Sequence, residues 1–176
     1  MNRINPELEE SALLEMACQL CVAARTAPKG KGKDLLFTAI VTGQDKQRLA
    51  DKMCEIAERD GVAFFAGDAG NLEVSQLVVL IASRKEPLGI PHCGYCGFPD
   101  CEEMDAAGGT CTFNSGDLGI AVGSAASRAA DLRLDNRIMY SAGKAALELG
   151  LLPTEARMAY AIPLCVSGKN PFFDRG

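Results

Sequence analysis

The sequence predicts a single α+β domain that carries a long cysteine-rich loop. Some segments repeat apolar residues at helical spacing, and others are compact apolar runs of strand length. Between them, residues 87–112 are rich in Gly, Pro, Cys and acidic residues and show no sustained periodicity. A loop this long inside a compact domain is usually functional. Residues 1–176 show no repeat or break in composition, so we expect one domain.

The first half of the chain predicts two helices and three strands. Helical spacing of apolar residues predicts a largely buried helix over residues 6–27 and an amphipathic helix over 44–61, which Gly61 ends. A compact apolar run predicts a central strand over 35–42. "VAFFA" and "QLVVLIAS" are two further strand candidates, and the second is apolar enough to be buried on both faces.

The second half predicts two helices and a last strand. Residues 114–135 carry one apolar stripe, with Asn114 or Ser115 as the expected N-cap. Residues 135–150 repeat the helical pattern and end at Gly150. "ARMAYAIPLCVSG" then predicts the final strand.

Charge and composition narrow the class of partner. The net charge of -5 argues against a sequence-independent nucleic-acid binder, which usually presents a basic surface. Small molecules or proteins are the expected partners. The acidic start of the chain and its lack of a long apolar run predict neither a signal peptide nor a membrane span, so we expect a cytoplasmic protein.

Eight cysteines have several expected uses, because a reducing compartment disfavours structural disulfides. Cys54 and Cys165 lie in apolar segments and are expected in the core. Cys18 and Cys21 form a C-x-x-C pair within a predicted helix. Core packing is the favoured interpretation of this pair, and a position near a redox centre is the alternative.

The other four thiols, Cys93, Cys96, Cys101 and Cys111, are spaced as C-x2-C-x4-C-x9-C. Four thiolates in one loop predict either an iron–sulfur cluster or structural zinc, with free or disulfide-forming thiols as the third alternative. Structural zinc sites usually pair two C-x2-C knuckles, whereas this loop has one, so the spacing favours a cluster. A [4Fe-4S] core with four thiolates is anionic, and Cys111 precedes a predicted helix start, which favours an anion.

The residues around these cysteines add two expectations. Four acids should lower the reduction potential of a cluster and favour a basic surface on a partner protein: Asp100, Glu102, Glu103 and Asp105. His92 is expected to be a partly exposed loop residue, because its adjacency to Cys93 makes simultaneous ligation awkward.

The string "CGYCGFPDC" resembles the cluster-binding motif of the iron–sulfur domain shared by electron-transport complexes and the corrinoid iron–sulfur protein. In that domain the last ligand usually lies further downstream than Cys111 does here. Over nearly the whole chain, and most distinctively from residue 101 to 151 and in "PLCVSGKNPFFDR", the sequence resembles an uncharacterised family of ferredoxin-domain-containing proteins.

A fainter resemblance concerns the fold. "AARTAPKGKGKDLLFTAIVTG" and "GKAALELGLLP" are similar to segments of nitroreductase-like flavoproteins. This implies a central, mostly antiparallel sheet flanked by helices, a homodimer, and flavin at the subunit interface. It places Arg25, Lys29 and Lys31 near a flavin, although the basic Arg/Ser motif usual at the start of such enzymes is absent. Without flavin, the lysines are expected in a solvated loop.

These observations predict an iron–sulfur redox protein that passes single electrons to or from a partner protein or small molecule. The first alternative is an FMN-dependent, nitroreductase-like oxidoreductase fed by the cluster. The second is a non-catalytic protein whose four loop cysteines bind structural zinc.

Overall fold

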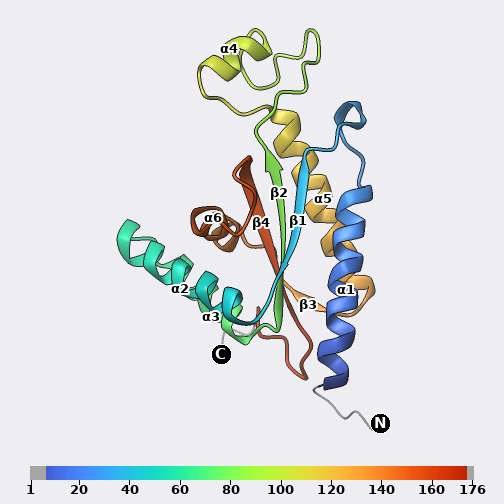
Figure 1. Ribbon diagram of the computed structural model, residues 1–176, viewed down its shortest axis with the longest axis vertical. Coiled ribbons are helices and arrows are strands. Elements are labelled where there is room, and N and C mark those ends of the chain that lie inside the picture. Colours follow the sequence, from blue (N-terminus) through green and yellow to red (C-terminus); the bar gives the residue numbers. More distant parts are fainter. Residues whose placement is uncertain (1–6, 174–176) are drawn as a thin grey trace.

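The computed structural model describes residues 7–173, which form helices on both faces of one sheet (Figure 1). The elements follow one another as α1 (Glu7–Thr26), the 3₁₀ turn η1 (Gly30–Gly32), β1 (Leu36–Val41), α2 (Gly43–Asp60), α3 (Phe64–Val74), β2 (Leu77–Arg84), α4 (Cys101–Ala106), α5 (Thr112–Asp131), β3 (Asp135–Asn136), α6 (Tyr140–Leu149) and β4 (Ala156–Cys165).

The sheet is antiparallel throughout, with strand order β1-β2-β4-β3. Helices α2, α3 and α6 cover one face, and α1 and α5 cover the other (Figure 1). The predicted fold class, an α+β domain with a mostly antiparallel sheet between helices, is therefore confirmed. No helix in the described part of the chain is long and apolar enough to cross a membrane.

Strand β2 forms the centre of both cores. Its alternate residues Val78, Leu80 and Ala82 face α2, α3 and α6. The residues between them, including Val79 and Ile81, face α1 and α5. Because successive strand side chains point to opposite faces, a run of this kind must be apolar at nearly every position. The expectation that "QLVVLIAS" is buried on both faces is confirmed.

Two strand predictions were wrong. Residues 35–42 contain β1, but β1 is an edge strand, because among the described residues only β2 pairs with it. "VAFFA" is not a strand, since α3 begins at Phe64. Phe65, Ala69 and Leu72 are buried at helical spacing along α3, a period that a five-residue window is too short to reveal.

Four predictions about loops and helices also need correction. The helix expected over residues 135–150 begins only at Tyr140, because Asp135–Asn136 form β3. The long cysteine-rich loop contains the short helix α4. Helix α5 begins at Thr112 with Cys111 in the N-cap position, so neither Asn114 nor Ser115 caps it. Helix α1 buries only one face, where Leu13 and Leu20 lie, and the opposite face is exposed. The predicted stops at Gly61 and Gly150 are confirmed, and both glycines are left-handed, with φ of 68° and 72°.

Helix α6 packs directly on the backbone of β4 through Gly143. A β-carbon at Gly143 would lie 2.1 Å from the carbonyl oxygen of Ala159. We therefore predict that Gly143→Ala lowers the free energy of unfolding by about 1–3 kcal/mol, because the helix must move away from the strand. Urea denaturation measures this change.

The matched control is Gly123→Ala on α5, where a β-carbon meets nothing within 4 Å. This substitution should leave stability unchanged or raise it by up to about 1 kcal/mol, because alanine favours helix. Equal effects of the two substitutions would contradict the close α6–β4 packing.

Candidate metal centre

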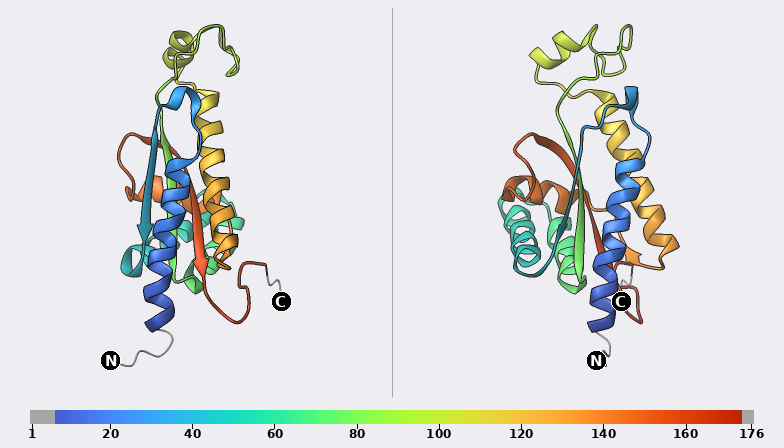
Figure 2. Two further views of the ribbon diagram at one scale, coloured as in Figure 1. Left: turned by 90° about the vertical axis from the view of Figure 1, so that its right-hand side faces the viewer. Right: turned by 45° about the vertical axis from the view of Figure 1, so that its right-hand side comes forward.

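The four loop cysteines lie on an arm, residues 85–111, which leaves the end of β2 and returns into α5. The arm projects beyond one end of the sheet (Figures 1 and 2). It has a small core of its own, in which Leu88, Met104 and Cys111 pack with Leu35 from the segment before β1. This core holds the arm against the domain.

Local hydrogen bonds shape the arm around its cysteines. The Asp100 carboxylate accepts a hydrogen bond from the Glu103 N–H at 2.9 Å, which caps α4 directly before Cys101. Gly94 and Gly97 flank Cys96 with left-handed φ values of 60° and 83°, a conformation that favours glycine. The Gly97 N–H donates to the Gly94 carbonyl at 3.0 Å and closes a turn. The C-x2-C knuckle is therefore a tight turn.

The root of the arm is held by Asn114, in the first turn of α5. Its Nδ2 donates to the carbonyls of Arg84 at 2.7 Å and Glu86 at 2.9 Å. Asn114 is 2% exposed. Asparagine looked like a helix cap from sequence, but its amide is used to fix where the chain leaves β2.

All four predicted ligands line one cavity of about 100 Å³: Cys93, Cys96, Cys101 and Cys111. All are free thiols. The four thiols line the same cavity but are not close enough together to bind a metal ion in this arrangement. Within residues 7–173, no three His, Cys, Asp or Glu side chains lie close enough together to hold a metal ion.

The donor set nevertheless fits a soft metal or an iron–sulfur cluster. Four thiols with no competing disulfide match the preference of zinc and iron–sulfur centres for thiolate. Cys111 is the N-cap of the 20-residue helix α5, whose first N–H groups have no partner within the helix. These groups favour negative charge beside Cys111.

Some of the polar residues near the cysteines are exposed, and others are already bonded within the arm. His92 is exposed, as predicted, and has a left-handed φ of 55°. Glu102 and Glu103 are exposed on α4. Asp105 lies 3.3 Å from the Lys85 ammonium, and Asp100 caps α4, so these two carboxylates are engaged within the arm.

Arg25, one of the predicted flavin contacts, is committed to its own chain. Its Nη1 forms an ion pair with Asp34 and donates to the Leu36 carbonyl at 2.9 Å. Partial burial alone would raise the pKa of Asp34, but the hydrogen bonds from Arg25 and the Leu36 N–H hold that pKa below its ordinary value. The pair fastens the end of α1 to the start of β1.

The two predicted lysines are engaged as well. The Lys29 ammonium donates to three carbonyls at the end of α1, those of Ala24, Arg25 and Ala27. These bonds use all three of its protons. Lys31 reaches the arm, where it donates to the Leu88 carbonyl at 3.1 Å. The predicted role of Arg25, Lys29 and Lys31 in flavin binding stays a prediction.

The remaining cysteines lie apart from the arm. Cys165, the last residue of β4, is buried in the core, as predicted, whereas Cys54 is only half-buried. Cys18 is exposed, which contradicts core packing for that residue. Burial raises the pKa of the half-buried Cys21, which therefore stays protonated and unreactive near neutral pH.

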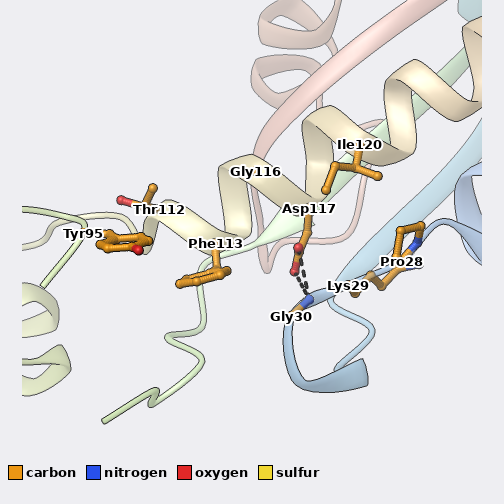
Figure 3. Close-up of a pocket in the computed structure, with 9 residues that line it drawn as sticks. All are labelled: Pro28, Lys29, Gly30, Tyr95, Thr112, Phe113, Gly116, Asp117 and Ile120. Atoms are coloured by element: carbon orange, nitrogen blue, oxygen red, sulfur yellow. Dashed lines mark hydrogen bonds between the residues drawn. The ribbon is translucent and has the colours of Figure 1, made fainter. Parts of the chain in front are cut away.

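Sequence reasoning missed a second cavity beside the arm, which we call the ring pocket (Figure 3). It measures about 350 Å³ and is lined by Pro28, Lys29, Gly30, Tyr95, Thr112, Phe113, Gly116, Asp117 and Ile120. The α5 residues among them are spaced along one face of that helix, which was the only signal in the sequence. Thr112 also lines the cysteine cavity, so the two cavities are neighbours.

Comparison with known sequences identifies a family model that matches the C-terminal part of the chain and a relative that covers most of it. Residues 107–175 match the family described as "Uncharacterized protein containing a ferredoxin domain". Of the four arm cysteines, this match contains Cys111. A protein of Archaeoglobus fulgidus described as "Uncharacterized protein" is 40% identical over 161 residues, which cover 87% of this chain and 86% of that protein.

Comparison with solved structures bears on the fold. An FMN-dependent nitroreductase from Clostridium difficile R20291 aligns with a TM-score of 0.56 at 18% identity, over 88% of this chain and 76% of that one. A BluB-like flavoprotein from Clostridium difficile 630 aligns with a TM-score of 0.56 at 17% identity, over 89% and 81%. The chain therefore has the fold of nitroreductase-like flavoproteins, as its resemblance to them implied.

The Asn114 clamp leads to a prediction about stability. Asn114→Ala should lower the free energy of unfolding by roughly 1–3 kcal/mol, because it removes two part-buried hydrogen bonds and leaves the Arg84 carbonyl with only the Ser83 hydroxyl as a donor. Amide hydrogen exchange should show the largest loss of protection in the arm and the end of β2.

Asn136→Ala is the control, since it removes a single amide hydrogen bond, to Leu134, at the far edge of the sheet. Its cost should stay below about 1.5 kcal/mol and spare the arm. If Asn114→Ala left arm exchange unchanged, Asn114 would not hold the root.

Proposed function

Because the chain belongs to the family of uncharacterised proteins that contain a ferredoxin domain, we propose that it is an iron–sulfur redox protein. In this proposal Cys93, Cys96, Cys101 and Cys111 hold one cluster of the [4Fe-4S] type. The protein exchanges single electrons with a partner protein or a small molecule.

The observation that carries this proposal is the convergence of four free thiols on one cavity at the tip of the domain. The chain reaches that cavity from three different local structures: a glycine turn, the start of α4 and the start of α5. Only Cys111 is itself buried, whereas the other three are partly exposed. A bound cluster supplies a one-electron redox centre.

The chain's own residues prepare this site in three ways. Buried Met104 and Leu88 exclude water from one side of the cysteines. The first N–H groups of α5 favour negative charge near Cys111. Exposed Glu102 and Glu103 oppose added negative charge, which favours a low potential and a basic partner surface.

An FMN-dependent oxidoreductase is the second candidate, supported by the fold. The solved structures of similar fold include an FMN-dependent nitroreductase. In that candidate FMN would accept electrons from the cluster. Arg25, Lys29 and Lys31, the residues predicted to lie near a flavin, would first have to break the bonds that they make within the chain in this structure.

The first test is metal and cofactor analysis after purification without oxygen. We expect iron and acid-labile sulfide in equal amounts, with a broad visible absorption that bleaches on reduction. A yellow flavin spectrum would support the FMN candidate. One zinc per chain without iron would contradict the redox proposal and favour the structural zinc alternative.

The second test concerns the fourth ligand. Cys111→Ser should release iron to a chelator roughly tenfold faster than the unchanged protein, since a hydroxyl is a poor ligand for iron–sulfur centres. Serine is a good N-cap, so α5 should still begin at the same residue.

Cys54→Ser on α2 is the matched control and should keep its iron. Equal iron retention in both variants would remove Cys111 from the ligand set. Cys165, Cys18 and Cys21 lie apart from the arm in this structure, so the fourth ligand would then come from outside the observed cavity.

A further inference from the structure

The ring pocket has an apolar wall next to the cysteines. Tyr95 lies between Cys93 and Cys96, and its ring stacks on Phe113 with centroids 6.0 Å apart and planes 9° apart (Figure 3). Tyr95 is 75% exposed and Ile120 is 48% exposed. A cavity of this size with apolar and aromatic walls is typical of a small-molecule site.

The floor of the pocket is a buried carboxylate. Asp117 is 9% exposed, and both of its oxygens accept from the same Gly30 N–H, at 3.1 and 3.0 Å. An ionised carboxylate can accept about four hydrogen bonds. Within residues 7–173, no other group donates a hydrogen bond to it. A carboxylate this buried with one protein donor is under-satisfied, because buried charges normally have several partners.

Unused hydrogen-bonding capacity selects the kind of ligand. Among the described residues, Lys29 and Asp117 are the charged ones that line the pocket. The three donors of Lys29 are used on the carbonyls at the end of α1, so Lys29 has no N–H left to offer a ligand. The Asp117 carboxylate can still accept hydrogen bonds, which favours a ligand that carries a donor.

We propose that the ring pocket binds a planar ring compound that carries an O–H or N–H group at its edge. The ring lies against Tyr95, Phe113 and Ile120, and its edge donates to Asp117. The idea that this ligand is the small-molecule redox partner rests on the proposed function. Its binding to the ring pocket does not depend on that function. Thr112, which lines both cavities, brings the ligand beside the cysteines.

The test compares three probes with one ring system: 2,3-dihydroxynaphthalene, 2,3-dimethoxynaphthalene and 2-naphthoate. Their affinities for the full chain are measured by isothermal titration calorimetry. We expect the diol to bind roughly tenfold more tightly than the diether, because a hydrogen bond to a charged group is among the stronger ones. The carboxylate probe should bind most weakly.

Two substitutions and one control locate the binding. Asp117→Asn keeps an acceptor for Gly30 and should reduce the preference for the diol to about twofold or less. Ile120→Trp, on the exposed rim, should block both neutral probes. Asp131→Asn, at the exposed end of the same helix, should change nothing.

Any of four results would overturn the proposal. These are equal affinity for diol and diether, tighter binding of the naphthoate, no binding of any probe, and binding that survives Ile120→Trp. Iron analysis of the same samples separates it from the proposed function. Protein that binds the diol but holds no iron would support the pocket and contradict the redox role. Iron-loaded protein that ignores the diol would do the reverse.

Discussion

The side-chain amide of Asn114 donates to two carbonyls at the point where the chain leaves β2. Three features of the structure depend on this contact. It fixes the first residue of the arm, it fixes the first turn of α5, and it therefore fixes the distance that the arm must span between them. An arm held at both ends by one residue can return Cys111 to the cavity that Cys93, Cys96 and Cys101 line.

The same helix places a second clamp one turn later. Asp117 holds the Gly30 N–H, so α5 also fixes the segment between α1 and β1. Gly30 lies close to the arm there, because a β-carbon at this position would lie 2.5 Å from Leu88 Cδ1 and the Leu88 side chain would have to move. Lys31 completes the link by donating to the Leu88 carbonyl. Two loops that are distant in sequence are thus tied to each other as well as to α5.

The sequence was sufficient wherever a local pattern determines structure. The left-handed stops at Gly61 and Gly150 follow from the freedom of glycine, and the double burial of β2 follows from its unbroken apolar run. Strand order is not local, so the edge position of β1 could not be read from its residues. The start of α5 was misplaced because asparagine serves equally well as a cap and as a clamp.

The site shows the same division. Spacing alone singled out the four arm cysteines, which the fold does bring to one cavity. Spacing could not find the ring pocket, since its walls come from the loop after α1, the arm and α5. The lysines show why the number of charged residues in a segment does not reveal which of them can bind a ligand. Lys29 spends its donors on the carbonyl end of α1, where a cation is favoured by the helix dipole.

That use of Lys29 has a consequence for selectivity. A loop containing three lysines would be expected to attract anions, yet Lys29 is bonded to α1, Lys31 to the arm and Lys33 to Glu86. Each of these ammonium groups already donates to carbonyls or to a carboxylate, whereas Asp117 accepts from a single N–H within residues 7–173. The cavity beside the cysteines therefore offers an unused acceptor, although the loop that borders it is rich in lysine. A molecule that enters there is selected by the hydrogen-bond donor that it can bring to Asp117.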